Sequence, residues 1–383
     1  MRSRWSMVAA FALLGTVTQV LWVTFAPVTD AAADHYGVSV GAIGWLANVF
    51  PLLYVLLAIP AGVVLDRWFR AGLGAGAVLV ALGGLLRIVG DTYVWAFAGQ
   101  VVVAIGQPLV LNAITGVAAR YLVERDRPKG IAIGSASTFA GLIVGFGLGT
   151  VLDVRPLLEV QAALAVAAAV VVFVALRIPA GDARRAPAGF GALRIAWGDS
   201  YLRWLCGLVF VPFGVFVALT TFAQPLLEPA GVSASTAGLI LMANVVAGVI
   251  GCAVVPIWAT RREVPVMGVA LLVTAGACVT LAVVPGVVTG YATLTLLGFA
   301  LLPALPIVLG LTERRAGEAE GTAAGLIWLA GNLGGLVVAA VIGLLVDQPA
   351  LAFALLGVLS VLTLGVLRQF ARRTSSPTEP PSR

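Results

Sequence analysis

The sequence predicts an all-α integral membrane protein whose twelve transmembrane helices form two pseudo-symmetric bundles of six. The first observation is composition: 61% of the 383 residues are hydrophobic and 10% are charged, whereas soluble domains are about half apolar and a quarter charged. The second is a series of apolar runs of about 20 residues, the length that crosses ~30 Å of hydrocarbon as a helix. The third is an internal repeat that divides these runs into two equal sets.

The apolar runs are long and continuous, which favours helices over the short alternating strands of a membrane barrel. The first run continues through Val28, which is longer than the apolar part of a signal peptide, so we interpret it as a retained helix. The expected spans are residues 7–29, 41–65, 72–90, 94–120, 130–152, 157–177, 201–227, 233–259, 265–284, 288–312, 321–346 and 350–370.

A loop rich in Pro, Gly and Arg separates the sixth span from the seventh. The last residues are rich in Pro and Ser, a composition typical of disordered tails. The expected organisation is an N-terminal six-helix bundle (1–178), a cytoplasmic linker (179–200), a C-terminal six-helix bundle (201–371) and a disordered cytoplasmic tail (372–383).

The basic residues give the orientation. With twelve spans, nearly all arginines fall on one side of the membrane, and only Arg87 and Arg155 fall on the other. The positive-inside rule places the arginine-rich side in the cytoplasm, together with both termini. We therefore expect a multi-pass protein of the plasma (inner) membrane.

Two pairs of segments indicate an internal duplication. The stretch that begins Gly-Val-Ser at Gly37 aligns without gaps with the stretch that begins Gly-Val-Ser at Gly231, and each covers the second span of its half. Likewise "GIAIG" (130–134) and "GTAAG" (321–325) open the fifth span of each half. Folds built from such repeats rock their halves about a binding site near the middle of the bilayer.

The loop "GVVLDRWFR" (62–70) between the second and third spans brings one acid and two arginines together. The arginines alone would anchor the topology, but the acid adds nothing to such an anchor. A glycine allows two helices to approach closely, and a carboxylate is stabilised by the positive N-terminal end of a helix. The acid therefore favours a further role over a plain topology anchor for four residues of this loop, Gly62, Asp66, Arg67 and Arg70.

This loop resembles the G-x-x-x-D-R-x-G-R-[RK] signature of the major facilitator superfamily, with Trp68 and Phe69 in place of the usual x-Gly. The resemblance implies the two-bundle major facilitator fold and a reversible gating latch formed by the four residues named above. In that fold Asp66 would face the start of the eleventh helix, in the other half. The second-half copy has Thr260 at the position of Asp66, so the latch would be one-sided.

Four further stretches resemble the family named for the feline leukaemia virus subgroup C receptor, a group of haem/choline-type carriers: residues 19–46, 99–121, 136–149 and 317–335. In that family, carriers of choline-like cations hold the ammonium against a tryptophan of helix one and a tyrosine of helix seven. Trp22 matches the tryptophan, but Val217 takes the position of the tyrosine, with Phe216 beside it. Phe139 and Asn332 replace two glutamines. The resemblance implies a carrier with an altered site.

Amide and aromatic side chains gather near the middle of the spans in both halves. Amides in hydrocarbon need partners and therefore face the bundle interior or a wet cavity, and the faces of aromatic rings attract cations. Helix–helix packing is the alternative role for each ring. The substrate-binding candidates are Gln19, Trp22, Gln100, Gln107, Phe139, Phe213, Phe216, Asn244, Trp328 and Asn332.

The central parts of the spans carry no acid or base, and charged residues such as Asp30 and Arg87 lie near their outer ends. Proton-driven carriers usually need a titratable residue along the path. The helix-four arginine of the superfamily is replaced by Gln100 or a neighbour, and its helix-five Gly-Pro antiporter signature is absent. The prediction is a facilitator for a small organic solute, neutral or cationic, that works by alternating access. A proton-coupled efflux antiporter is the alternative.

Other classes of function are less favoured. A non-transporting membrane receptor would need a soluble domain, and no loop exceeds about 25 residues, below the usual ~50 of a domain. An enzyme is not expected, since the single His35 offers no nucleophile–His–acid set. No spacing of Cys206, Cys252 and Cys278 suggests a metal site. We expect a monomer in the lipid bilayer with a small-molecule substrate, no cofactor and no nucleic-acid partner.

Overall fold

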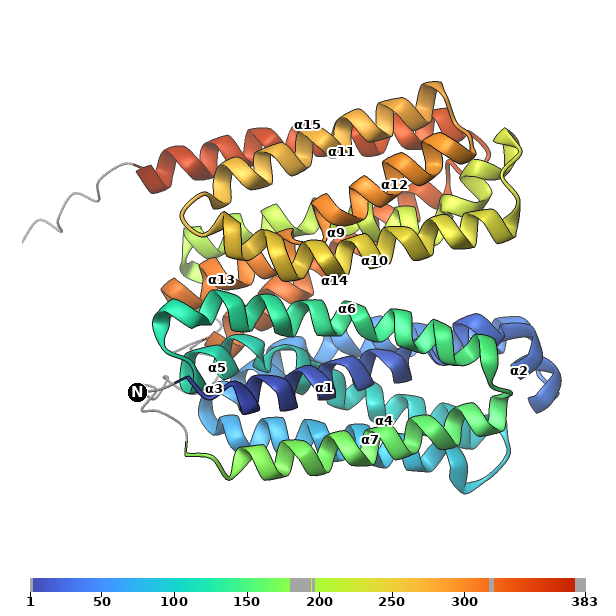
Figure 1. The fold of residues 1–383 in the computed structure, drawn as a ribbon, viewed down its shortest axis with the longest axis vertical. Helices are drawn as coiled ribbons and strands as arrows, with labels where there is room; N and C mark the ends of the chain where they lie inside the picture. The colour runs from blue at the N-terminus through green and yellow to red at the C-terminus, as the bar shows by residue number, and fades with distance from the viewer. Residues whose placement is uncertain (1–2, 180–193, 195–196, 317–319, 376–383) are drawn as a thin grey trace, which may run out of the picture.

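The computed structural model describes residues 3–179, 194, 197–316 and 320–375, and within these ranges the chain is helical with no strand. Figure 1 shows two stacked sets of roughly parallel helices, a blue-to-green N-terminal set below and a yellow-to-red C-terminal set above. The fold class predicted from the sequence is confirmed.

The helices of each set are consecutive in the chain. The N-terminal bundle consists of α1 (Trp5–Trp22), α2 (Thr29–Tyr36), α3 (Val40–Val89), α4 (Tyr93–Leu111), α5 (Ala113–Tyr121), α6 (Arg127–Val151) and α7 (Val154–Leu176). The C-terminal bundle consists of α9 (Ser200–Leu227), α10 (Ala234–Ala259), α11 (Glu263–Val283), α12 (Val287–Leu301), α13 (Ala304–Ala316), α14 (Glu320–Gly343) and α15 (Pro349–Ser375).

The described residues include eleven helical stretches that are long and apolar enough to cross a membrane, and one of them, Ala42–Val89, has 48 residues. A straight helix of that length would measure about 70 Å, more than twice the hydrocarbon thickness. The helical dihedral angles break at Trp68 (φ −136°, ψ 58°). Gln100 donates to the Leu46 carbonyl at 3.1 Å and accepts from Arg87 at 3.4 Å, so both arms of α3 lie beside it. The stretch is therefore two antiparallel helices, and the described residues make the twelve predicted crossings.

Two crossings expected as single helices are broken near their middle. The fourth divides into α4 and α5 at Asn112, four residues after Pro108. The tenth divides into α12 and α13 at Pro303. Proline has no backbone N–H and its ring clashes with the preceding turn, so it kinks or ends a helix. The fourth and tenth helices are equivalent in the two halves, so the break is itself part of the repeat.

The repeated Gly-Val-Ser segments adopt the same backbone in both halves. Gly37 and Gly231 have left-handed φ angles of 65° and 78°, a conformation that favours glycine. Two residues later, the hydroxyl oxygens of Ser39 and Ser233 accept hydrogen bonds from the backbone N–H groups of Ala42 and Thr236, in the first turns of α3 and α10, each at 3.2 Å. The glycine ends one element and the serine caps the next.

Both ends of the described chain lie on the same side of the bundles, at the left in Figure 1, where the first residues lead into α1 and where α15 ends. α15 continues to Ser375, so residues 372–375 of the expected tail are helical. Residues 376–383 and most of the expected linker, 179–200, lie outside the described residues. The domain boundaries stay predictions.

Candidate functional site: the boundary between the two bundles

One face of α3 forms a seam with α14 of the other bundle. Four residues of α3 recur at intervals of four, Tyr54, Ala58, Gly62 and Asp66, and this spacing places them on one side of a helix. Each of them contacts α14. The seam extends over about 18 Å at 1.5 Å per residue, from an aromatic pair to an acid near the turn of α3.

Small residues let the two helices touch along this seam. A Cβ atom on Gly62 would lie 2.6 Å from the Gly321 carbonyl oxygen, and a Cβ atom on Gly325 would lie 2.7 Å from the Ala58 carbonyl oxygen. Neither position has room for a methyl group without separating the backbones. Close approach through small residues is a common way for helices to associate in membranes.

Asp66 lies at the start of α14. Its carboxylate accepts hydrogen bonds from the backbone N–H groups of Gly321 and Thr322, the second at 2.9 Å, and from the Thr322 hydroxyl. The first N–H groups of a helix have no partner within the helix and carry partial positive charge. Asp66 therefore caps a helix of the opposite bundle, on the side of the molecule that carries both termini. Its role as a reversible latch stays a prediction.

The two arginines of the same loop do not cross the boundary. Arg67 and Arg70 are exposed, and the Arg67 guanidinium stacks on the Trp68 ring at 4.4 Å. Neither forms an ion pair with the described part of the chain. Their positions suit an anchor at the membrane surface.

A second bond between the bundles was not anticipated from the sequence. Arg127, at the start of α6, donates to Glu313 of α13 at 2.7 Å, and only 4% of the Glu313 side chain is exposed. Arg127 also donates to the Ala119 carbonyl at 3.3 Å. Glu313 could have been selected from the sequence, because it is an acid beside arginines at the end of an apolar span, as Asp66 is.

Aromatic rings meet across the boundary. Tyr54 of α3 lies 6.3 Å from Trp328 of α14, and Phe139 of α6 lies 6.3 Å from Phe216 of α9 in a T-shaped arrangement, measured between ring centroids. Phe213 contacts Trp328 at 6.4 Å within the C-terminal bundle. Such spacings are typical of favourable aromatic pairs. We call these five residues the boundary cluster.

Polar groups without partners lie near this cluster or on helices that adjoin it. The Trp328 indole N–H and the Gln19 side-chain oxygen on α1 are both buried, and neither has a hydrogen-bond partner. Gln107 is 4% exposed. Asn332 donates to the Trp328 carbonyl of its own helix at 2.9 Å. Unpaired groups of this kind are costly in a protein interior, which is a reason to look for a ligand at this boundary.

Trp22 lies between α1 and α3. Its indole N–H donates to the Ala47 carbonyl at 3.1 Å, and its ring contacts Phe50 at 6.3 Å. Trp22 is half-buried, so one part of the ring packs and another remains accessible.

Two candidates lie inside single bundles. Gln100 is fully buried in the N-terminal bundle. Its side-chain amide donates a hydrogen bond to the Leu46 carbonyl and accepts one from the Arg87 guanidinium. The Asn244 amide donates to the Leu294 carbonyl of α12 within the C-terminal bundle. The structure does not bring these amides to the boundary cluster.

Tyr54 and Asn112 were missed as candidates. The Tyr54 hydroxyl donates to the Asn112 side-chain oxygen at 2.6 Å, and the Asn112 amide donates to the Ala58 carbonyl at 2.7 Å. Asn112 is an amide in mid-span, so the rule that selected Gln107 would also have selected it. Among the described residues, no three His, Cys, Asp or Glu side chains lie together as a metal site would need.

The sequence model of the Major Facilitator Superfamily matches residues 7–339. The chain belongs to this superfamily. A relative is solute carrier family 49 member A3 of Danio rerio, 26% identical over 87% of this chain and 76% of the relative. Another is the choline/ethanolamine transporter flvcr2b of Danio rerio, 22% identical over 68% of this chain and 60% of that protein.

Solved members of the superfamily share the fold. The transporter FucP in the outward conformation superposes with a TM-score of 0.76 at 19% identity, covering 97% of this chain and all of FucP. The human organic anion transporter MFSD10 gives a TM-score of 0.78 at 17% identity, covering 94% of this chain and 99% of MFSD10. The protein is a multi-pass membrane transporter, and the resemblance stated from the sequence is confirmed.

Proposed function

We propose that this superfamily member is a facilitator that moves a small organic solute, neutral or cationic, across the plasma (inner) membrane by alternating access. The observation that carries the proposal is the boundary cluster, which joins the two bundles through uncharged rings. Ring faces bind apolar groups and cations, and superfamily transporters bind solutes between their two halves. Trp22, Gln19 and Gln107 would complete the site.

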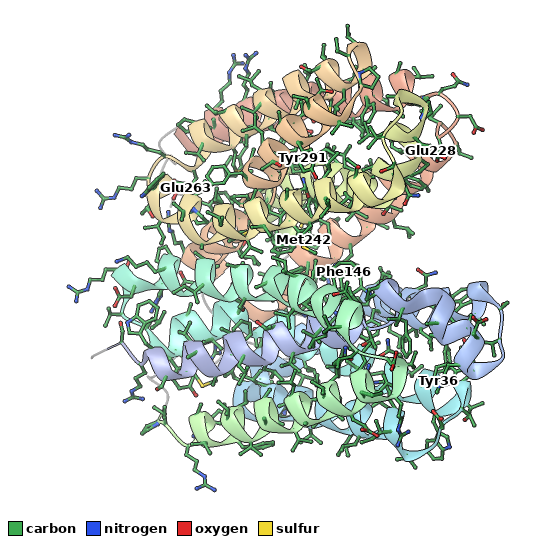
Figure 2. All side chains as sticks on the ribbon, turned by 45° about the vertical axis from the view of Figure 1, so that its right-hand side comes forward. Tyr36, Phe146, Glu228, Met242, Glu263 and Tyr291 are labelled. Atoms are coloured by element: carbon green, nitrogen blue, oxygen red, sulfur yellow. The ribbon has the colours of Figure 1, made fainter. Side chains whose placement is uncertain are left out.

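The side that carries the termini is closed in this structure. Asp66 caps α14 and Arg127 pairs with Glu313 there, so the solute would be exchanged from the opposite side. Figure 2 shows nitrogen-tipped side chains gathered at the same end of the helices as the N-terminus. Under the positive-inside rule that end is cytoplasmic, and the two contacts would open when the solute is released inward.

An amine is the class of solute that we favour. The relative flvcr2b carries the name choline/ethanolamine transporter, and Trp22 stands where the resembled family has its cation-binding tryptophan. Val217 stands where that family has a tyrosine, so the ring on α9 would come from Phe216 or Phe213. We also infer a monomer. We infer no catalytic activity, because the single His35 pairs with Asp91 at 2.8 Å, away from the boundary cluster.

Proton coupling is the second candidate, and one observation favours it. Asp66 and Glu313 are buried carboxylates that hold the bundles together, and protonation of either would weaken its contact. The boundary cluster itself contains no acid or base, which favours the facilitator.

Transport by purified protein in proteoliposomes separates the two mechanisms. A thermal-shift screen against quaternary amines, vitamins, haem and sugars first identifies a ligand. Its uptake is then measured with and without a protonophore, with the membrane voltage clamped by potassium and valinomycin. A facilitator is expected to show the same initial rate in both cases, and collapse of uptake when the proton gradient is removed would assign the antiporter.

A further inference from the structure

A buried polar group lies inside the N-terminal bundle, apart from the boundary between the bundles. Arg87 of α3 is 1% exposed, and Thr24, Gln100 of α4 and Gln161 of α7 are fully buried. Arg87 Nη1 donates to the Thr24 hydroxyl at 2.8 Å and to the Gln100 side-chain oxygen at 3.4 Å. The Thr24 hydroxyl contacts the Gln161 side-chain oxygen at 2.6 Å. The group thus joins four crossings near their outer ends.

This group has more donors than acceptors. Arg87 Nε, Arg87 Nη2 and Gln161 Nε2 are buried and have no hydrogen-bond partner. Arg87 forms no ion pair with any described residue. An unpaired charge in a membrane-embedded interior costs several kcal/mol or more, on the order of a protein's whole stability, and buried charges are normally paired. The missing partner is an acceptor with negative charge.

Tyr36 lies near Arg87 and near charges of both signs. Figure 2 shows Tyr36 at the outer end of the N-terminal bundle. Burial, together with the nearby Asp91 carboxylate, raises the pKa of Tyr36 to about 12, while Arg87 and Arg155 act in the opposite direction. Both cations therefore lie near the Tyr36 hydroxyl, which stays protonated and remains a donor. Asp91 is paired with His35 and does not neutralise Arg87.

The unpaired donor atoms of Arg87 and Gln161 have almost no accessible surface, so a partner for them has to be small. The stem of Arg87 packs on Gly99, where an added Cβ atom would lie 2.4 Å from Arg87 Cγ. The guanidinium is thus held by its stem as well as by Thr24 and Gln100. A monatomic ion needs less room than a carboxylate and accepts several N–H donors at once.

We propose that Arg87 and Gln161 bind a chloride ion that enters from the outer side beside Tyr36. The ion neutralises the guanidinium, accepts the free N–H groups of both residues and ties the outer ends of α3 and α7 to α1 and α4. The site lies within one bundle, so it stabilises that bundle and takes no part in holding the transported solute.

The test is thermal unfolding of the purified full-length protein in sodium chloride and in sodium gluconate at equal ionic strength. A ligand that binds only the folded state raises the unfolding midpoint along a saturating curve. We expect that curve in chloride and a flat line in gluconate. Arg87→Met should remove the chloride response, whereas Arg125→Met, which removes an exposed arginine at the opposite end, should retain it. A wild-type midpoint that is the same in both salts overturns the proposal.

Two variants of Gln161 keep the test decisive if Arg87→Met does not fold. Gln161→Glu supplies a fixed carboxylate beside Arg87, so its midpoint should be independent of chloride and at least as high as that of the wild type in saturating chloride. Gln161→Leu removes one donor and should raise the half-saturating chloride concentration roughly tenfold, the effect of one lost hydrogen bond to a charged group. A full chloride response in Gln161→Glu shows that the ion binds elsewhere and contradicts the proposal.

Discussion

Asp66 and Thr322 are 256 residues apart in the chain, yet the backbone N–H and the hydroxyl of Thr322 both donate to the Asp66 carboxylate. The bonds join a turn of the N-terminal bundle to the first turn of a helix in the C-terminal bundle. Both partners are polar and lie at a membrane edge, so water can replace each bond when the bundles separate. We therefore expect the contact to be reversible, as a latch requires.

Asp66→Asn should slow transport without affecting insertion. The amide removes the charge and presents an N–H group to N–H donors, and hydrogen bonds to charged groups contribute about 1.5–3 kcal/mol. A loss of that size shifts the balance between closed and open states roughly 10–100-fold. Initial uptake rates measure the effect, and Asp347→Asn, at an exposed carboxylate, is the control. Normal uptake by Asp66→Asn would mean that the residue is not a latch.

Gly62→Ala should keep the bundles from closing on the cytoplasmic side. The new methyl group would lie 2.6 Å from the Gly321 carbonyl oxygen, and two backbones cannot yield as a flexible side chain does. A cysteine introduced near Thr322 should therefore react faster with a thiol reagent added from the cytoplasmic side. Gly44→Ala is a matched control in the same helix, since a Cβ atom there meets nothing within 4 Å. Equal labelling in the two variants would contradict the close contact.

Exchanging the charges of Arg127 and Glu313 should preserve their ion pair. Arg127→Glu or Glu313→Arg alone places like charges together and should favour the open state, while the double variant should restore much of the wild-type rate. The Arg314–Glu263 pair, also at 2.7 Å, lies within the C-terminal bundle and is the control. Its reversal should leave the conformational balance unchanged. Absence of rescue in the Arg127–Glu313 double variant would show that the two charges do not act as a pair in transport.

Trp22→Ala should weaken substrate binding more than it slows turnover. Loss of a ring that holds a cation costs about 1–2 kcal/mol, or roughly tenfold in affinity. The half-saturating concentration of the ligand found in the screen measures this change. Trp258→Ala removes a 75% exposed ring and is the control. An unchanged half-saturating concentration in Trp22→Ala would assign the ring to packing against Phe50.

The number of crossings, their approximate limits and the repeat could all be predicted from the amino-acid sequence. Length and apolar content decide whether a segment spans a membrane, and these are local properties of the chain. The turn at Gly37 and Ser39 is local as well, since a glycine in the left-handed conformation and a serine N-cap depend only on adjacent residues. The partner of Asp66 was predictable through the resemblance of its loop to the superfamily signature, which implies that the acid faces the start of the eleventh helix.

Which residues face one another became clear from the folded structure. Most of these helices are apolar on every side, so their sequences carry little information about the inward face. The sequence therefore grouped Gln100 with the boundary candidates, although its partners Leu46 and Arg87 lie within one bundle. It also passed over Tyr54, because its partner Trp328 is far away in the chain. Contacts across the two bundles exist only once the halves have docked, and docking is decided by the shapes of the two complete surfaces.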